Sequence, residues 1–359
     1  MKKYLLNFVK AVCFLVVLSL VLSLASKYIT PKNNTAEEGM YDPKTHSFIS
    51  EPKNSFEVLF IGNSDARCGF SPNELWHNYG ITSFVIGQNS QTAGMMYTAF
   101  EQFIKTQKPK VVVLETDVFF ATPEYSKRVE KDLCAVVEAL FPVALNHDVW
   151  KQYTFKELIT PANYTDHYFG KGQGLYVEIK PDKKGERIKS EKEFVRPDVA
   201  LFTDLLLSRC KSLGIEVMFV ELPTTTSWNM ARHLATKEFA DKRGIKFWDM
   251  QVNMKELGFD LMVDSKDYGN HLNYDGAIKA TALIGDYLHK NYNELVDYRS
   301  DPAYDSWNDD YETYIKTAAR MKKKYEEKQK AEEEKAAKEK AAKDKANKDS
   351  SSKKDGGKK

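Results

Sequence analysis

The stretch Glu57-Val58-Leu59-Phe60-Ile61-Gly62-Asn63-Ser64-Asp65 decides the fold. Its apolar part, from Glu57 to Ile61, predicts a buried strand. Gly62 permits a tight turn directly after that strand. Ser64 would then present its hydroxyl at the top of a sheet, where its own amide can point toward a developing oxyanion. Gly-Asn-Ser is also an ordinary loop composition, so a catalytic interpretation needs a partner for the serine.

Beyond this stretch, short apolar runs alternate with amphipathic segments, as a parallel sheet with crossover helices requires. The strands we expect are Glu57 to Ile61, Ser83 to Ile86, Val111 to Glu115, Glu216 to Glu221 and Lys246 to Trp248. We expect one helix after the capping box Ser71-Pro72-Asn73-Glu74 and a second that carries the apolar stripe Met96, Phe100, Phe103 and Ile104. Three further helices are expected at residues 197–213, 229–242 and 277–291. The pattern predicts an α/β fold.

The chain divides into segments of different composition. We expect a hydrophobic anchor at residues 1–28, a polar stalk at 29–54, a catalytic domain at 55–310 and a charged tail at 311–359. Within the domain the pattern loses its regularity between 120 and 196, where scattered aromatic residues and lysines occur. This segment is interpreted as an insertion beside the active site that covers the substrate, or as a surface excursion.

The N-terminal segment carries a positive charge followed by an apolar run. Lys2 and Lys3 precede a stretch that reaches Ala25, which sets a cytoplasmic start. Ser23-Leu24-Ala25 is compatible with signal-peptide cleavage, whereas Lys27 and Tyr28 are typical of an interfacial anchor. We favour an uncleaved anchor, and therefore a single-pass membrane protein with an extracytoplasmic domain.

The C-terminal tail is rich in lysine. Residues 321–359 contain 15 lysines against 9 acidic residues and almost no side chain able to join a core. The composition predicts a solvated helix that fades into disorder. Such a tail is suited either to attraction toward an anionic polymer or membrane surface, or to solubility alone.

The cysteines and short motifs argue against cofactor chemistry. Cys13 lies in the apolar segment, which leaves Cys68, Cys134 and Cys210, and the spacing of these three matches no metal site. Burial as small apolar side chains is the favoured interpretation, and one disulfide among them is the alternative. Because no phosphate-binding loop, zinc signature or nucleic-acid motif occurs, we expect no cofactor, no metal and no nucleic-acid partner.

A histidine late in the chain is the candidate partner of Ser64. It lies in Tyr268-Gly269-Asn270-His271-Leu272-Asn273, just before a predicted helix and beyond the last predicted strand. An acid four residues earlier, Asp267, could hold the imidazole through its Nδ1 proton, and Asp264 lies close upstream. The alternative is an exposed loop histidine with helix-capping neighbours.

The loop after the second predicted strand could stabilise an oxyanion. In Gly87-Gln88-Asn89-Ser90-Gln91, a backbone amide and a carboxamide are available for this task. Losing one such donor typically lowers the rate by about 100- to 1000-fold. The alternative is that Ser90 or Thr92 only caps the following helix.

These three segments resemble, in order and strand position, those of the SGNH (GDSL-type) hydrolases, whose nucleophile lies in a Gly-Asp/Asn-Ser motif near the start. The chain is more closely similar to a membrane-anchored extracytoplasmic branch that includes DltD-like and alginate-acetylation proteins. This resemblance spans 55–307 and includes Gln107-Lys108-Pro109-Lys110, Phe141-Pro142, Asn146-His147-Asp148-Val149-Trp150, Pro223 and His271-Leu272-Asn273. It implies a three-layer, flavodoxin-like fold with a five-stranded parallel sheet.

The resemblance also implies roles for individual residues. Ser64 would be the nucleophile, His271 the base, and the amide of Ser64 with Gly87 and Asn89 the oxyanion site. The family at large has an acid three residues before the histidine, where this chain has Tyr268. The acid is therefore assigned to Asp267, with Asp264 as the alternative. Glu115-Thr116 stands where the family carries an asparagine, which would leave the oxyanion site incomplete or differently built.

These residues predict acyl transfer through an acyl-serine, with water or a sugar hydroxyl as acceptor. The resemblance implies a cell-surface polysaccharide that gains or loses a small acyl group, and a membrane-bound O-acyltransferase partner that supplies acyl groups. Two alternatives remain. The first is a non-catalytic module of the same fold that binds or scaffolds an envelope polymer, and the second is a lipase or esterase that acts on lipids.

Overall fold

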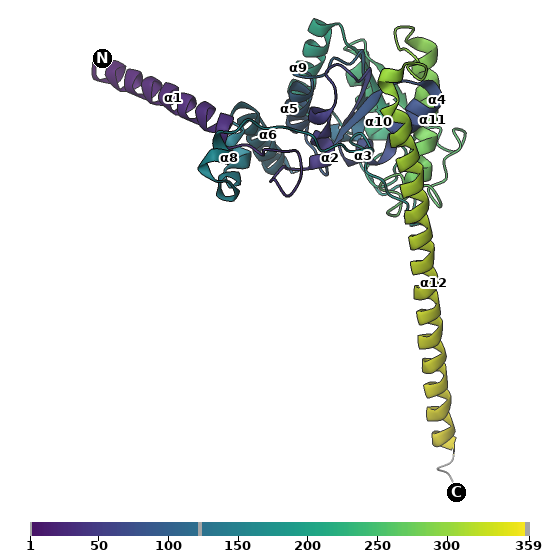
Figure 1. Ribbon diagram of the computed structural model, residues 1–359. Coiled ribbons are helices and arrows are strands. Elements are labelled where there is room, and N and C mark those ends of the chain that lie inside the picture. Colours follow the sequence, from purple (N-terminus) through teal and green to yellow (C-terminus); the bar gives the residue numbers. More distant parts are fainter. Residues whose placement is uncertain (1, 121–123, 356–359) are drawn as a thin grey trace. The chain divides into compact units, whose positions relative to one another are not determined.

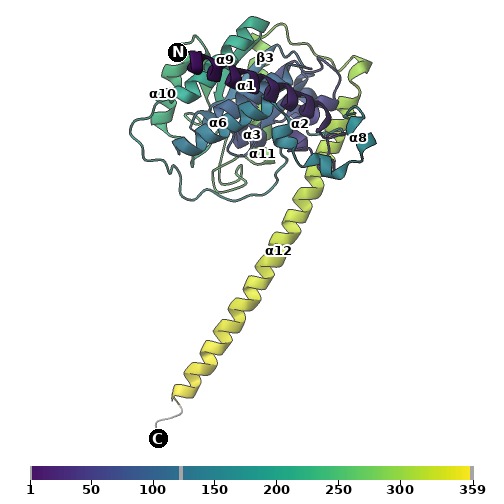
Figure 2. The ribbon, with the colours of Figure 1, turned by 90° about the vertical axis from the view of Figure 1, so that its left-hand side faces the viewer.

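A computed structural model describes residues 2–120 and 124–355, and it shows a five-stranded parallel sheet between helices (Figure 1, Figure 2). The strand order is β2-β1-β3-β4-β5. The strands are β1 (Val58–Gly62), β2 (Ser83–Gly87), β3 (Val111–Glu115), β4 (Glu216–Glu221) and β5 (Lys246–Asp249). The predicted fold class is confirmed, and each predicted strand lies within one residue of the observed bounds.

The core lies on both faces of the sheet because successive strand residues point to opposite sides. Leu59 and Ile61 of β1 pack toward one layer, whereas Val58 and Phe60 pack toward the other. The first layer is built by α5 (Ala93–Phe103), α9 (Pro197–Leu213) and α10 (Met230–Asp241), and the second by α3 (Ser64–Gly69), α4 (Pro72–Tyr79) and α11 (Tyr274–Asn291). Burial on both faces explains why the strands are continuous apolar runs.

The helix starts follow their capping residues. Ser71 caps α4 by accepting a hydrogen bond from the amide of Glu74, as the sequence predicts. The bounds of α9 agree with the predicted 197–213. Helix α11 begins three residues earlier than predicted, because the Asn273 side chain accepts the amide hydrogen bond of Gly276 at 3.1 Å and so caps the helix at that point.

The insertion contains a regular helix that our sequence analysis did not assign. Helix α6 (Tyr125–Leu140) runs for 16 residues. Its buried positions include Arg128 and Asp132, so polar side chains lie where an amphipathic pattern would place apolar ones. The interpretation of residues 120–196 as an insertion that covers the substrate, or as a surface excursion, stays a prediction. The shorter elements that follow are α7 (Val143–Asn146), η3 (Val149–Gln152) and α8 (Phe155–Ile159).

The segment expected as a stalk packs on the domain. It forms α2 (Pro43–His46) and η1 (Ser47–Ser50), and the Phe48 ring lies in the core against Phe84 and Phe103. Glu51, at its end, accepts a hydrogen bond from the buried ammonium group of Lys171 at 2.8 Å. Through these contacts, the segment that connects α1 to β1 in the sequence is held against the sheet.

Helix α1 (Lys2–Tyr28) is the described helix that is long and apolar enough to cross a membrane. None of its residues is buried. A signal sequence has the same length and composition, and the uncleaved anchor stays a prediction. At about 1.5 Å per residue, its length exceeds the roughly 30 Å of a bilayer core.

The chain forms two compact units, Met1–Tyr314 and Ile315–Lys359. Helix α12 (Ser306–Asp355) begins in the first unit and supplies the second. Helix α12 continues to Asp355, and residues 356–359 lie outside the described residues. The fading of the tail from helix into disorder stays a prediction. The remaining short turns are η2 (Thr116–Phe119) and η4 (Pro302–Tyr304).

Candidate active site

The candidate nucleophile stands at the first position of a helix that follows β1. Strand β1 ends at Gly62, and Ser64 begins α3. Asn63 caps α3, because its side-chain oxygen accepts the amide hydrogen bond of Asp65 at 2.8 Å. Ser64 is half-buried, so its hydroxyl is held at the carboxyl edge of the sheet and remains accessible.

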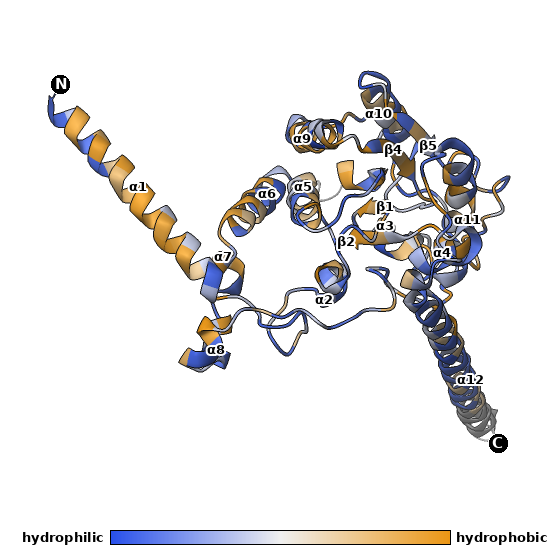
Figure 3. Ribbon diagram, turned by 45° about the horizontal axis from the view of Figure 1, so that its top comes forward, coloured by the Kyte–Doolittle hydropathy of each residue, from blue (hydrophilic) through white to orange (hydrophobic). Residues whose placement is uncertain are grey.

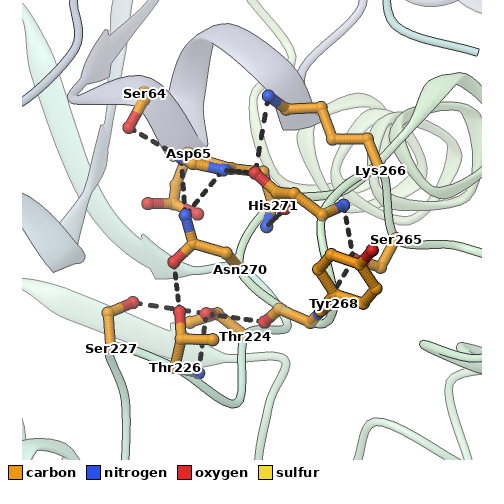
Figure 4. Close-up of polar contacts among 12 residues, drawn as sticks. Ser64, Asp65, Thr224, Thr226, Ser227, Ser265, Lys266, Tyr268, Asn270 and His271 are labelled. Carbon is orange, nitrogen blue, oxygen red and sulfur yellow. Dashed lines mark hydrogen bonds and ion pairs between the residues drawn. The ribbon is translucent and has the colours of Figure 1, made fainter. Parts of the chain in front are cut away.

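The structure brings Ser64, His271 and Asp267 into one hydrogen-bonded chain. Figure 4 shows Ser64 and His271 in this arrangement. His271 Nε2 lies 2.8 Å from Ser64 Oγ. His271 Nδ1 lies 2.6 Å from Asp267 Oδ2. The other carboxylate oxygen of Asp267 accepts the backbone amide of His271 at 2.7 Å. The arrangement therefore has the order of a nucleophile, a base and an orienting acid.

The alternative acid lies elsewhere. Asp264 is buried, accepts the Asp260 amide at 2.8 Å and pairs with Lys279 at 2.7 Å. It thus supports the turn that leads into α11. Of the two acids considered from the sequence, Asp267 is the one that contacts the histidine.

The loop that carries His271 is folded tightly on itself. Tyr268 and Gly269 have positive φ angles of 64° and 87°. The Gly269 amide donates to Ser265 Oγ at 2.7 Å, while its carbonyl accepts the Thr225 amide at 2.8 Å. A side chain at Gly269 would overlap Thr225 Oγ1, which makes glycine necessary at this position. The fold-back explains how an acid four residues before the histidine reaches its Nδ1 atom.

Electrostatics favour the charged form of the histidine. Burial lowers the pKa of His271, but the neighbouring carboxylates of Asp65 and Asp267 outweigh burial and raise the pKa above its usual value. Burial likewise opposes the charge of Asp267, yet hydrogen bonding to His271 and the nearby positive charges hold the pKa of that carboxyl below its usual value. This pairing would stabilise an imidazolium on His271.

Buried acids lie beneath the nucleophile. Glu115 ends β3 and contacts Gly62, so an acid occupies the place where the resemblance implies an asparagine. Asp117 accepts one hydrogen bond from the Asn63 carboxamide at 2.7 Å, and Glu221 accepts one from the Thr116 hydroxyl at 2.7 Å. Burial raises the pKa of all three carboxyls, which favours their neutral forms.

Of the two residues predicted to form the oxyanion site, Gly87 packs beside Ser64, whereas Asn89 is exposed. Gly87, at the end of β2, packs against the carbonyl of Asn63 and the amide of Arg67, on either side of Ser64. Asn89 is exposed, and no hydrogen bond within residues 2–120 and 124–355 joins it to Ser64 or His271. Thr92 caps α5, as the alternative interpretation of this loop predicts.

A cationic pocket adjoins the catalytic loop. It has a volume of about 490 Å³ and is lined by Pro181, Lys183, Lys184, Arg187 and Tyr268. Tyr268 directly follows Asp267, and its carbonyl accepts a hydrogen bond from Arg187. The insertion thus supplies a positively charged wall next to the triad.

Sequence reasoning assigned no role to several residues that shape the site. The Asn270 carboxamide lies 2.8 Å from His271 Nδ1 and is bonded to the Thr226 hydroxyl (Figure 4). Asp65, next to the nucleophile, is buried, and burial raises its pKa well above the usual value. Asp65 follows Ser64 and Asn270 precedes His271 in the sequence, and this position was the signal that could have identified both residues.

No protein-family model and no curated protein matches the chain. Among solved structures, it is similar to a catalytic mutant of an acetylxylan esterase from Geobacillus stearothermophilus, with 14% identity, a TM-score of 0.35 and coverage of 66% of this chain and 94% of that one. It is also similar to a GDSL-like lipase from Bacteroides thetaiotaomicron, with 14% identity, a TM-score of 0.33 and coverage of 65% and 87%. At these values we infer function from the geometry of the site alone.

Proposed function

We propose that the protein is a serine esterase or O-acyltransferase that works through an acyl-serine intermediate on Ser64. The observation that carries this proposal is the chain of two contacts, 2.8 and 2.6 Å long, that links Ser64 Oγ through His271 to Asp267. A serine is a weak nucleophile unless a positioned base takes its proton, and this geometry provides such a base.

The reaction follows from the positions of these atoms. Ser64 Oγ attacks the carbonyl carbon of an ester while its proton passes to His271 Nε2. The leaving alcohol takes that proton, and the acyl group stays on Ser64. Water or a sugar hydroxyl then gives its proton to His271 and attacks the acyl-serine, which releases the product and restores the serine. The amides of Ser64 and Gly87, with Asn89, would stabilise the oxyanion.

The proposed substrate is a cell-surface glycan that carries small acyl esters. The apolar helix α1 supports an extracytoplasmic, membrane-anchored location. The pocket formed by Lys183, Lys184 and Tyr268 supports an acceptor with acidic sugars, because an aromatic ring beside cations suits a charged sugar ring. A membrane-bound O-acyltransferase is the proposed source of acyl groups when the reaction runs as transfer.

Labelling with a fluorophosphonate probe tests the proposal. The wild-type chain should be labelled, and Ser64→Ala should not. Ser90→Ala, in the exposed loop after β2, is the matched control and should be labelled as the wild type is. Absence of labelling in the folded wild type would favour a polymer-binding module without catalysis. A preference for long acyl chains in an ester panel would favour a lipase instead.

A further inference from the structure

Helix α6 turns its polar face toward the interior of the protein and its apolar face toward the outside, the opposite of an ordinary surface helix. Arg128, Asp132 and Ala135 are buried at helical spacing. On the opposite side Leu133 and Leu140 are 61% and 65% exposed, and Val137 between them is exposed as well. Residues four and seven positions apart share a face of a helix, so these three side chains form one apolar outer stripe.

The inner face of α6 is fixed by polar contacts. Asp132 Oδ1 accepts the Gly94 amide at 2.8 Å and the Thr92 hydroxyl at 2.5 Å. Arg128 pairs with Asp198 at 2.5 Å. Turning the helix to bury its leucines would leave these charges unpaired, which costs several kcal/mol. The apolar stripe is therefore a stable feature of the surface.

The next short helices continue the apolar surface. On α8, Phe155 is 79% exposed, and Ile159 lies one turn further along the same face. Trp150 is also exposed, in the turn before α8. Figure 3 shows hydrophobic colouring along α1 and on α6 and α8. Exposed apolar side chains gathered in this way mark an interaction surface rather than ordinary solvent-facing residues.

This surface lies beside the end of α1. Helix α7, between α6 and α8, packs against α1, and the Val143 amide donates to Ser26 Oγ at 3.1 Å. The ammonium group of Lys32, just beyond α1, donates to the carbonyl of Leu158 in α8 at 2.8 Å. The insertion is thus joined to the point at which α1 would leave a membrane.

We propose that the outer faces of α6 and α8 are embedded in the interfacial region of the lipid bilayer that α1 enters. Lipid fits this surface because α7, which lies between α6 and α8 in the chain, packs against α1, a helix with the length and composition of a membrane span. Trp150 is of the type that gathers at the interface, while Lys151 and Lys156 can reach lipid head groups.

This contact would orient the active site. Thr92 and Gly94, which bind Asp132, lie at the start of α5, just beyond the carboxyl end of β2. Ser64 lies at the carboxyl end of the neighbouring strand β1. Helix α6 therefore connects the lipid-facing surface to the edge of the sheet that carries the nucleophile, and it holds that edge close to the membrane.

Spin labels on the full-length chain in phosphatidylcholine–phosphatidylglycerol vesicles test the proposal. Cys13 and Cys134 are first replaced by serine. Cys68 and Cys210 stay, because burial raises the pKa of both thiols to about 12 and keeps them unreactive. Labels are placed through Leu133→Cys, Leu140→Cys and Phe155→Cys. Collisions with oxygen, which concentrates in lipid, are compared with collisions with a nickel chelate, which stays in water.

The matched control is Leu234→Cys on α10, a leucine that is 58% exposed on a helix beside β5, at the other end of the sheet. Leu18→Cys in α1 provides the lipid reference. We expect an oxygen-to-nickel ratio severalfold higher at the three test positions than at Leu234. Equal ratios at all four positions would overturn the proposal. Labels shielded from both reagents would also overturn it, since a second copy of the chain would then cover the surface. Circular dichroism checks that each variant is folded.

Discussion

His271 Nε2 lies 2.8 Å from Ser64 Oγ, although 207 residues separate the two in the sequence. The contact is supported from both sides, because each side chain is held by its own backbone surroundings. Ser64 begins a capped helix, and the His271 loop is bonded to Ser265 and Thr225. The site is therefore organised before an ester binds, which is the condition for efficient nucleophilic catalysis.

Replacing the orienting acid should stop catalysis without unfolding the chain. Asp267→Asn removes the acceptor for the Nδ1 proton and should lower kcat by roughly 10⁴-fold. Asp264→Asn is the matched control. It weakens the pairing with Lys279 and should lower the melting temperature, while the rate of fluorophosphonate labelling stays near that of the wild type. Loss of labelling in a folded Asp264→Asn variant, with labelling retained in Asp267→Asn, would reverse the two assignments.

The rate should depend on pH through His271. The imidazole acts as a base only when neutral, and its pKa lies above the usual 6.5, so kcat/KM for p-nitrophenyl acetate should rise with pH and reach half its maximum above 6.5. The residual activity of Asp267→Asn should reach its midpoint at lower pH. Lys266→Met should shift the midpoint upward, because the Lys266 charge lowers the pKa of His271. Identical midpoints in all three proteins would contradict this electrostatic account.

The buried acids should make the fold less stable as the pH rises. Burial raises the pKa of Glu115 and Glu221 above the usual 4.5, so above that pH the folded chain binds more protons than the unfolded chain does. The free energy of unfolding should then fall from pH 4.5 up to the pKa of the folded state. Glu115→Gln should flatten this slope in urea titrations. Glu216→Gln, at the exposed start of β4, should leave it unchanged.

The cationic pocket should matter for charged substrates alone. The double variant Lys183→Glu and Lys184→Glu should lower kcat/KM by roughly tenfold for an acetylated acidic oligosaccharide, because two attractive charges become repulsive. Turnover of p-nitrophenyl acetate, which is neutral, should not change. Lys211→Glu, near the end of α9, is the charge control and should affect neither substrate. An equal effect on both substrates would point to damage of the triad.

Much of the fold follows from the sequence because strands buried on both faces leave continuous apolar runs. The bounds of β3 and β4 agree residue by residue with that pattern. Leu133, Val137 and Leu140 of α6 have helical spacing, but this pattern would place them inside, whereas the buried face carries Asp132, which is stabilised by partners distant in sequence. Periodicity detects apolar burial, and it does not detect burial that depends on hydrogen bonds.

For the candidate site, position in the fold was more informative than local spacing. Ser64 and His271 could be paired because the carboxyl ends of parallel strands meet at one edge. The choice between Asp267 and Asp264 depended on the positive φ angles of Tyr268 and Gly269, which the sequence does not specify. The surroundings of Glu115 could not be predicted either, because Asn63 and Glu221, which contact this cluster from the turn after β1 and from β4, are distant from it in sequence.

The reversed helix α6 has a practical consequence for purification. Removing residues 1–28, the usual route to a soluble fragment, deletes α1 but leaves Leu133, Leu140 and Phe155 on the outside. Such a fragment would still need detergent, or polar replacements on that stripe, to remain monodisperse.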